Sequence, residues 1–135
     1  MIDQKLLDTW TPRLLGVLRI VIGFLYIQHG SAKLFGMPHI AMFDGLQLFS
    51  LMGLAGVLEL VGGGLIILGA FTRPAAFLLC GEMAFAYFMV HAPQGFLPIV
   101  NQGELAALYC FVFLYFSAAG AGAFSIDAAR RKTEG

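Results

Sequence analysis

The sequence is poor in charged residues. Lysine, arginine, aspartate and glutamate make up only 12% of the 135 residues, and their charges cancel. Without net positive charge the chain has no electrostatic basis for binding a nucleic-acid backbone, so we exclude that function. Cysteine is also scarce, because Cys80 and Cys110 are the only two and stand in neither a CxxC nor a metal-ligand spacing. We expect two free buried thiols at different membrane depths and no metal centre, with a redox pair as the alternative reading.

The motifs of several enzyme classes are missing as well. The sequence has no nucleophile elbow, dinucleotide fingerprint or phosphate-binding loop. The run Gly62-Gly63-Gly64 lies inside an apolar stretch, without the strand and lysine that a phosphate loop needs, and therefore indicates helix packing. No small-residue cleavage site follows the first apolar run, so we expect that run to be retained as a helix.

The abundant residues are apolar. Hydrophobic residues make up 59% of the chain and aromatic residues 13%, which is more than a domain of this size can bury in a core of its own. The sequence therefore predicts an all-α integral membrane protein, a four-helix bundle forming one domain over residues 1–135. The expected helices cover residues 12–35, 51–71, 75–91 and 103–124. Residues 39–50 form a short amphipathic segment between the first two helices, and residues 125–135 form a polar tail that frays.

The basic residues lie almost entirely at one end of this arrangement. With four spans, both termini and the turn after the second helix share one side of the membrane. That side holds Lys5, Arg13, Arg73, Arg130, Arg131 and Lys132, whereas the other side holds only Lys33. The positive-inside rule then predicts that both termini are cytoplasmic.

Polar residues form a stripe along the first helix. Arg19, Tyr26 and Lys33 are spaced seven apart with His29 beside them, and this spacing places them on one helical face. We expect Thr11-Pro12 to supply the cap at which the first helix begins. The depth of each residue in the membrane, counted from this start, predicts that Arg19 pairs with Glu82.

The same membrane depths predict two further contacts between helices. Tyr26 and His29 meet Glu59, which lies on a glycine face of the second helix, and Lys33 lies near Glu104 at the outer rim. We take Tyr26, His29 and Glu59 as the candidate buried polar site. The residues Arg19, Glu82, Lys33 and Glu104 are expected to form structural ion pairs.

Other readings of these residues remain open. Lys33 can extend to the head groups alone, and Asn101 with Glu104 resembles a capping box. His29 and His91 at similar depth could ligate a haem, and a cation site could be built from His29, Glu59, His91 and Glu104. Nothing else in the sequence supports either group, so we assign no metal.

The ordered set of motifs resembles the DoxX family of small four-helix bacterial inner-membrane proteins. The matching residues are Arg19, Gly23, His29-Gly30, Lys33-Leu34-Phe35-Gly36, Gly56, Glu59, Gly62-Gly63, Leu65, Gly69, Arg73, Met83, Ala84, His91, Asn101, Gly103-Glu104, Leu108-Tyr109, Gly120, Gly122, Ser125 and Asp127. The resemblance implies a bacterial inner-membrane location. Relatives include a membrane subunit of a thiosulfate:quinone oxidoreductase and proteins linked to redox and thiol homeostasis, while distant eukaryotic relatives resemble chaperones and cargo receptors.

Two functional hypotheses follow. In the first, the chain is a quinone-linked membrane subunit of an oxidoreductase, in which Tyr26, His29 or Glu59 handles the protons and a soluble or membrane partner supplies the redox centre. In the second, it is a non-catalytic scaffold, a chaperone-like protein or a module that binds lipid or a small solute. A homodimer is compatible with either.

Overall fold

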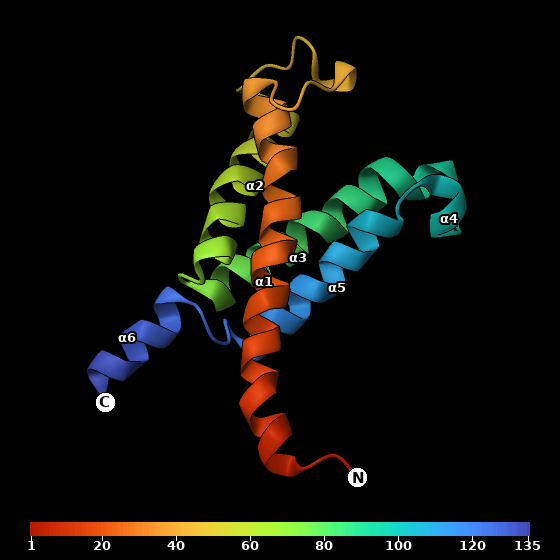
Figure 1. Ribbon diagram of the computed structural model, residues 1–135. Helices are drawn as coiled ribbons and strands as arrows, with labels where there is room; N and C mark the ends of the chain where they lie inside the picture. Colours follow the sequence, from red (N-terminus) through yellow and green to blue (C-terminus); the bar gives the residue numbers. More distant parts are fainter.

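The structure is a computed structural model that describes residues 1–135, and all its regular elements are helical (Figure 1). This confirms the predicted all-α class. The long helices are α1 (Gln4–Phe35), α2 (Leu51–Leu68), α3 (Thr72–Ala86) and α5 (Glu104–Ala119). The shorter elements are the 3₁₀ turns η1 (Ala41–Phe43) and η3 (Ala92–Gln94), the π-helical turn η2 (Tyr87–His91), and the helices α4 (Pro98–Asn101) and α6 (Ile126–Glu134).

The long helices pack as two antiparallel pairs. Helix α1 lies along α2, and α3 lies along α5. Figure 1 shows the pairs meeting near the middle of α1 and then diverging into two arms, one ending at η1 and the other at α4. Both termini lie at the opposite end. The core sits where the pairs meet, around the fully buried side chains Tyr26, Ile66, Leu79, Phe113 and Phe116. The four-helix bundle is therefore closed at the terminal end and splayed at the other.

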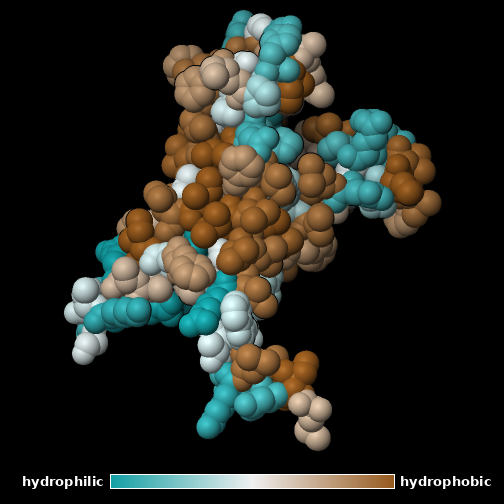
Figure 2. Space-filling model, in the orientation of Figure 1, coloured by the Kyte–Doolittle hydropathy of each residue, from teal (hydrophilic) through white to brown (hydrophobic).

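The outer surface is apolar over the middle of the molecule. Only 27 of the 135 residues are buried, and large apolar side chains such as Leu14, Phe24 and Phe111 point outward. Figure 2 shows this apolar region in brown between hydrophilic ends. The segments 4–35, 51–68 and 72–94 are long and apolar enough to cross a membrane, whereas the apolar α5 is shorter, at 16 residues. Such a surface suits lipid rather than water.

Close packing of α1 on α2 depends on glycine. A Cβ on Gly30 would lie 2.5 Å from the backbone nitrogen of Leu60, and a Cβ on Gly23 would lie 3.0 Å from that of Ile67. No side chain fits at these positions without moving a backbone. From the α2 side, Gly56 faces Leu34 and Gly63 faces Ile27, so the glycine face predicted for the second helix lies at the α1–α2 contact.

Two helix starts differ from expectation. Helix α1 begins at Gln4 rather than near residue 12, because the Asp3 carboxylate accepts from Lys5 N–H and supplies the cap earlier, and Pro12 lies inside the helix. The capping box of Asn101 and Glu104 is not formed. Gly103 is the N-cap of α5, and the side chain of Asn101 instead accepts from Gly103 N–H.

The segment 39–50 and the tail also differ. Only the three residues Ala41–Phe43 of the segment are helical, and Gly45, at φ 73°, ends any continuation. The fourth long helix stops at Ala119 rather than at residue 124, because Gly120 and Gly122 take positive φ. The tail does not fray but forms α6, which is docked on the start of α3.

Candidate functional site

Arg19 is the most completely bonded charged residue of the interior. Its side chain is fully buried, and all five N–H donors point at backbone carbonyl oxygens. Nε donates to Ala121 at 2.8 Å, Nη1 to Ile66 and Ile67 at 2.6 Å, and Nη2 to Ala123 at 3.1 Å and Phe124 at 2.8 Å. Two of these oxygens belong to the last turn of α2, where the helix dipole favours a cation. Arg19 therefore ties α1 to the end of α2 and to the segment after α5.

The predicted pair of Arg19 with Glu82 is therefore wrong. The depths were reckoned from residue 12, but the first part of α1 extends beyond the other helices, as Figure 1 shows. Arg19 consequently lies level with the end of α2 rather than with Glu82. Two partners predicted for the stripe are displaced by seven residues, because Glu82 bonds Tyr26 rather than Arg19, and Glu59 pairs with Lys33.

Lys33 shows this displacement directly. Its Nζ donates to Glu59 Oε1 at 2.7 Å, and the two side chains are only 10% and 3% exposed. The predicted pair of Lys33 with Glu104 is wrong, because Glu104 is exposed at the start of α5, on the other diverging arm. Glu59 therefore has a cationic partner within the α1–α2 pair.

Tyr26, rather than Arg19, is the partner of Glu82. Its hydroxyl donates to Glu82 Oε2 at 2.5 Å, joining α1 to α3. The Tyr26 ring packs edge-on against Tyr109 and Phe113 of α5, with centroids 5.1 and 4.9 Å apart. His29 lies against the same aromatic group, 6.2 Å from Tyr26 and 6.1 Å from Tyr109. The aromatic rings thus form one wall beside the carboxylate.

Two carboxylate oxygens in this region have no hydrogen-bond partner. They are Glu59 Oε2 and Glu82 Oε1, and both atoms are buried. Their partners Lys33 and Tyr26 are seven residues apart on one face of α1, so the two carboxyl groups lie in the same region. Buried polar atoms are almost always hydrogen-bonded, so an unpartnered pair needs an explanation, such as a proton or a bound molecule. We call the set Tyr26, His29, Lys33, Glu59, Glu82 and Tyr109 the buried polar site.

The structure thus brings Tyr26, His29 and Glu59 into one region and adds two residues that were expected elsewhere, Lys33 and Glu82. Tyr109 was not singled out for the site. An aromatic residue on an apolar helix carries no sequence signal beyond core packing.

Neither histidine lies in a metal-type cluster, since no group of three or more metal-ligating side chains comes together. His91 is the last residue of η2 in the α3–α5 arm, and its Nδ1 is 3.0 Å from the carbonyl oxygen of Asn101. Asn101 itself is fully buried and donates to Gly95 O at 2.9 Å and Tyr87 Oη at 3.2 Å. These residues fasten the loop between η2 and α5.

The predicted positions of the cysteines are wrong. Cys80 and Cys110 do not lie at different depths, because α3 and α5 run side by side and bring the two sulfur atoms to 3.7 Å.

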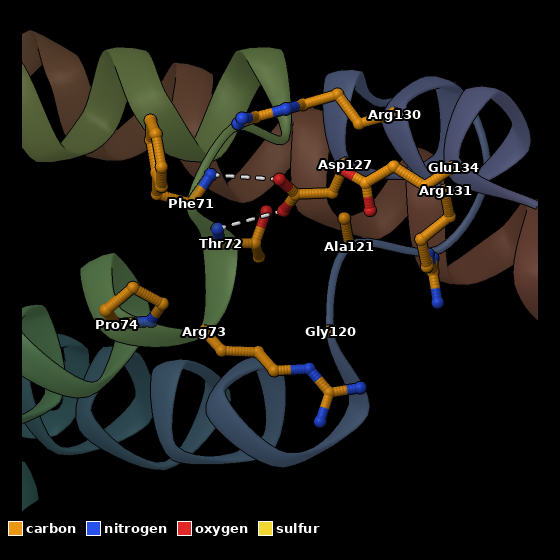
Figure 3. Close-up of a pocket in the computed structure, with 10 residues that line it drawn as sticks. All are labelled: Phe71, Thr72, Arg73, Pro74, Gly120, Ala121, Asp127, Arg130, Arg131 and Glu134. Carbon is orange, nitrogen blue, oxygen red and sulfur yellow. Dashed lines mark hydrogen bonds between the residues drawn. The ribbon is translucent and has the colours of Figure 1, made fainter.

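A second polar region lies at the terminal end, shown in Figure 3. It is a surface pocket of about 480 Å³ between the start of α3, the segment after α5, and α6. Arg73, Arg130 and Arg131 line it and form no salt bridge, although the Arg130 guanidinium lies over the Phe71 ring at 5.3 Å. The Asp127 carboxylate accepts from Phe71 N–H and Thr72 N–H, each at 3.0 Å.

Burial by itself raises the pKa of Asp127, but the hydrogen bonds from Thr72 and Phe71 and the nearby Arg130 outweigh it. The pKa of Asp127 therefore lies below its ordinary value, and the carboxylate stays ionised on the backbone of α3.

These features define a membrane protein of four apolar helices, splayed as two pairs around a buried polar site. The sequence model of the DoxX family matches residues 14–92, and the chain belongs to that family. An uncharacterized protein of Haemophilus influenzae is 48% identical over 126 residues, which is 90% of this chain and 93% of the relative. No solved structure matches the chain.

Proposed function

We propose that the buried polar site binds the head group of a lipid-soluble quinone and exchanges protons with it, within a membrane oxidoreductase. The observation that carries the proposal is the pair of unpartnered, buried oxygens on Glu59 and Glu82. Every donor of Arg19 has a hydrogen-bond acceptor, whereas these two carboxylate oxygens have no donor. A ligand or a proton held between them would supply the missing hydrogen bonds.

The charges of the site favour proton exchange. Two carboxyl groups face one lysine, because Arg19 is bonded elsewhere. With both carboxyls ionised the region would carry an uncompensated negative charge in a medium of low dielectric, which is costly. A single proton held between Glu59 and Glu82 removes that cost. The pair can then give up or take a proton when a ligand changes its own protonation.

The chemistry of the site suits a flat, neutral ring. Tyr26, Tyr109 and His29 supply an aromatic wall, and such walls stack against planar rings. Quinone carbonyls accept hydrogen bonds, for which Lys33 and His29 offer donors. The hydroxyls of the quinol donate, for which Glu59 and Glu82 offer acceptors. Reduction of a quinone takes up two electrons and two protons.

We infer a route to the site from the lipid. Figure 2 shows a notch between the two diverging arms, and Figure 1 places the middle of α1 at its base. A lipid-soluble molecule that enters between the arms would arrive at the middle of α1 without crossing water. The splayed arrangement, which a closed bundle would lack, therefore supports a ligand that arrives from the bilayer.

We also propose the setting of the protein. Since the basic side chains of α6 and the α2–α3 turn lie at the terminal end, both termini face the cytoplasm of a bacterial inner membrane. A redox partner subunit supplies electrons, and a homodimer is compatible with the apolar outer faces. A reporter fused to the C-terminus tests the orientation.

The ligand is tested with decylubiquinone and purified protein in lipid nanodiscs. Glu59→Gln keeps the size of the side chain but removes the shared proton site, so we expect binding at least ~10-fold weaker, a loss of about 1.4 kcal/mol. Glu104→Gln is the matched control, because it neutralises an exposed carboxylate outside the site. Equal affinity of wild type and Glu59→Gln, or no binding by the wild type, would contradict the proposal.

A second candidate is recognition of an anionic lipid head group at the terminal-end pocket. Three arginines without salt-bridge partners line it, whereas one of its two carboxylates, Asp127, is already bonded to backbone. Arginine forks suit phosphate oxygens. Retention of phosphatidylglycerol or cardiolipin by wild type, lost in Arg73→Ala with Arg131→Ala but kept in Arg13→Ala, would support it. Equal lipid retention by the wild type, the double variant and Arg13→Ala would exclude this candidate. Competition by inorganic phosphate would show that the pocket recognises the phosphate group alone.

A further inference from the structure

The two cysteines touch across the α3–α5 contact. Cys80 Sγ and Cys110 Sγ are 3.7 Å apart, and both residues are partly exposed on the outer surface. Small residues build this contact, since the buried Ala76 lies one turn before Cys80 and the buried Ala106 one turn before Cys110. Small side chains four residues apart allow two membrane helices to approach closely.

The geometry suits a bond between the sulfur atoms. A disulfide has a sulfur–sulfur length of about 2.05 Å, so the sulfurs must approach by roughly 1.6 Å, which side-chain rotation with a slight approach of the helices provides. Two cysteines that merely filled space would not need to meet each other. These two are the only cysteines of the chain, and they face each other from different helices.

The thiols lie at the same level along α3 and α5 as residues of the buried polar site. Glu82 is two residues beyond Cys80 on α3, and Tyr109 directly precedes Cys110 on α5. The Tyr109 ring in turn packs against Tyr26, whose hydroxyl is bonded to Glu82. Along α3 and α5, a proton acceptor and one ring of the aromatic wall are therefore less than one helical turn from the two cysteines.

We propose that Cys80 and Cys110 form a reversible dithiol–disulfide pair that reduces the quinone. This inference rests on the proposed function, because the quinone at the buried polar site is the oxidant. Both S–H bonds break and one S–S bond forms. The two electrons and two protons released convert the quinone to the quinol. A dithiol donor from outside restores the thiols by exchange and is itself oxidised to a disulfide.

The test uses the reduced full chain in nanodiscs under anaerobic conditions with decylubiquinone. Free thiols are counted by maleimide labelling, the bond is detected as a loss of two hydrogens in the intact mass, and quinol is followed by absorbance. We expect both thiols to disappear within one chain and one quinol to form per chain. Cys80→Ser and Cys110→Ala should each lower quinol formation at least tenfold, at unfolding temperatures close to that of the wild type.

Separate measurement of quinone binding distinguishes the two proposals. Quinone that binds while both thiols stay free overturns the dithiol pair and leaves the proposed function standing. Absence of quinone binding overturns both. A disulfide that links two chains, seen as a dimer on a non-reducing gel, also overturns the pair, because the inference requires the bond within one chain.

Discussion

The two ends of the polar stripe on α1 are built differently. At Arg19 every donor has a backbone acceptor, and the side chain is fully buried between α1, the end of α2 and the segment after α5. Around Tyr26 and Lys33 the bonds are fewer, and one oxygen each of Glu59 and Glu82 is left without a partner. A charged side chain whose hydrogen bonds are all made (a saturated end) stabilises the fold, whereas a cluster with free acceptors (an unsaturated end) can still bind a ligand or a proton. Burial alone does not separate these two uses of polar groups.

The largest effect is expected at the saturated end. Arg19→Met leaves five carbonyl oxygens without their donors, and Arg19→Lys restores at most three of the hydrogen bonds without the planar fork. We expect Arg19→Met to lose at least about 3 kcal/mol of unfolding free energy, with Arg19→Lys recovering only part. Unfolding in mild detergent, followed by circular dichroism, measures both. Stability like that of the wild type for Arg19→Met would show that the carbonyl cluster does not hold the fold.

The next effect concerns the helix pair that carries Lys33 and Glu59. Gly30→Ala would place a Cβ 2.5 Å from Leu60 N, so α1 and α2 must separate, with an expected loss of about 1 to 3 kcal/mol. Gly64→Ala is the matched control, since its Cβ meets open space and the change should be neutral or stabilising by up to ~1 kcal/mol. The same unfolding assay compares them. Equal stabilities would mean that the close α1–α2 contact is not needed.

The polar stripe of α1 illustrates what the sequence could and could not predict. Apolar runs and the seven-residue spacing of Arg19, Tyr26 and Lys33 predicted the helical class and one polar face, because periodicity depends on local geometry alone. Partners across helices depend on relative depth, and two of them are displaced by seven residues, since Glu82 bonds Tyr26 and Glu59 pairs with Lys33. The contact of Cys80 with Cys110 likewise depends on how α3 and α5 align, which no local pattern encodes.

A smaller effect is expected within the unsaturated end. Tyr26→Phe removes the donor to Glu82 while keeping the ring, so we expect a loss of about 1 kcal/mol together with weaker quinone binding. Tyr109→Phe is the control, because the Tyr109 hydroxyl makes no hydrogen bond and only its ring contacts Tyr26. Thermal unfolding and quinone titration separate the two effects. Unchanged quinone affinity in Tyr26→Phe would show that the Tyr26 hydroxyl takes no part in binding the quinone.

The smallest effect is expected at Asp127, which fixes α6 near the saturated end. Because folding lowers its pKa, its stabilisation is fully present above the ordinary carboxyl pKa of about 3.9 and is lost as pH falls through the lower folded value. Asp127→Asn should cost about 1 kcal/mol or less near pH 7, as for a helix cap, and the difference should vanish in strong acid. Unfolding of both proteins from pH 7 down to pH 2 checks this. A difference that persists at low pH would assign another role to the side chain.

The most direct measurement is an experimental structure in native-like lipid with decylubiquinone present. The account predicts density for the head group beside Glu59 Oε2 and Glu82 Oε1, against Tyr26 and Tyr109, and none beside Arg19. Density for water alone at the two carboxyls, or a quinone bound elsewhere, would contradict the claim that the unsaturated end of the α1 stripe is the ligand site.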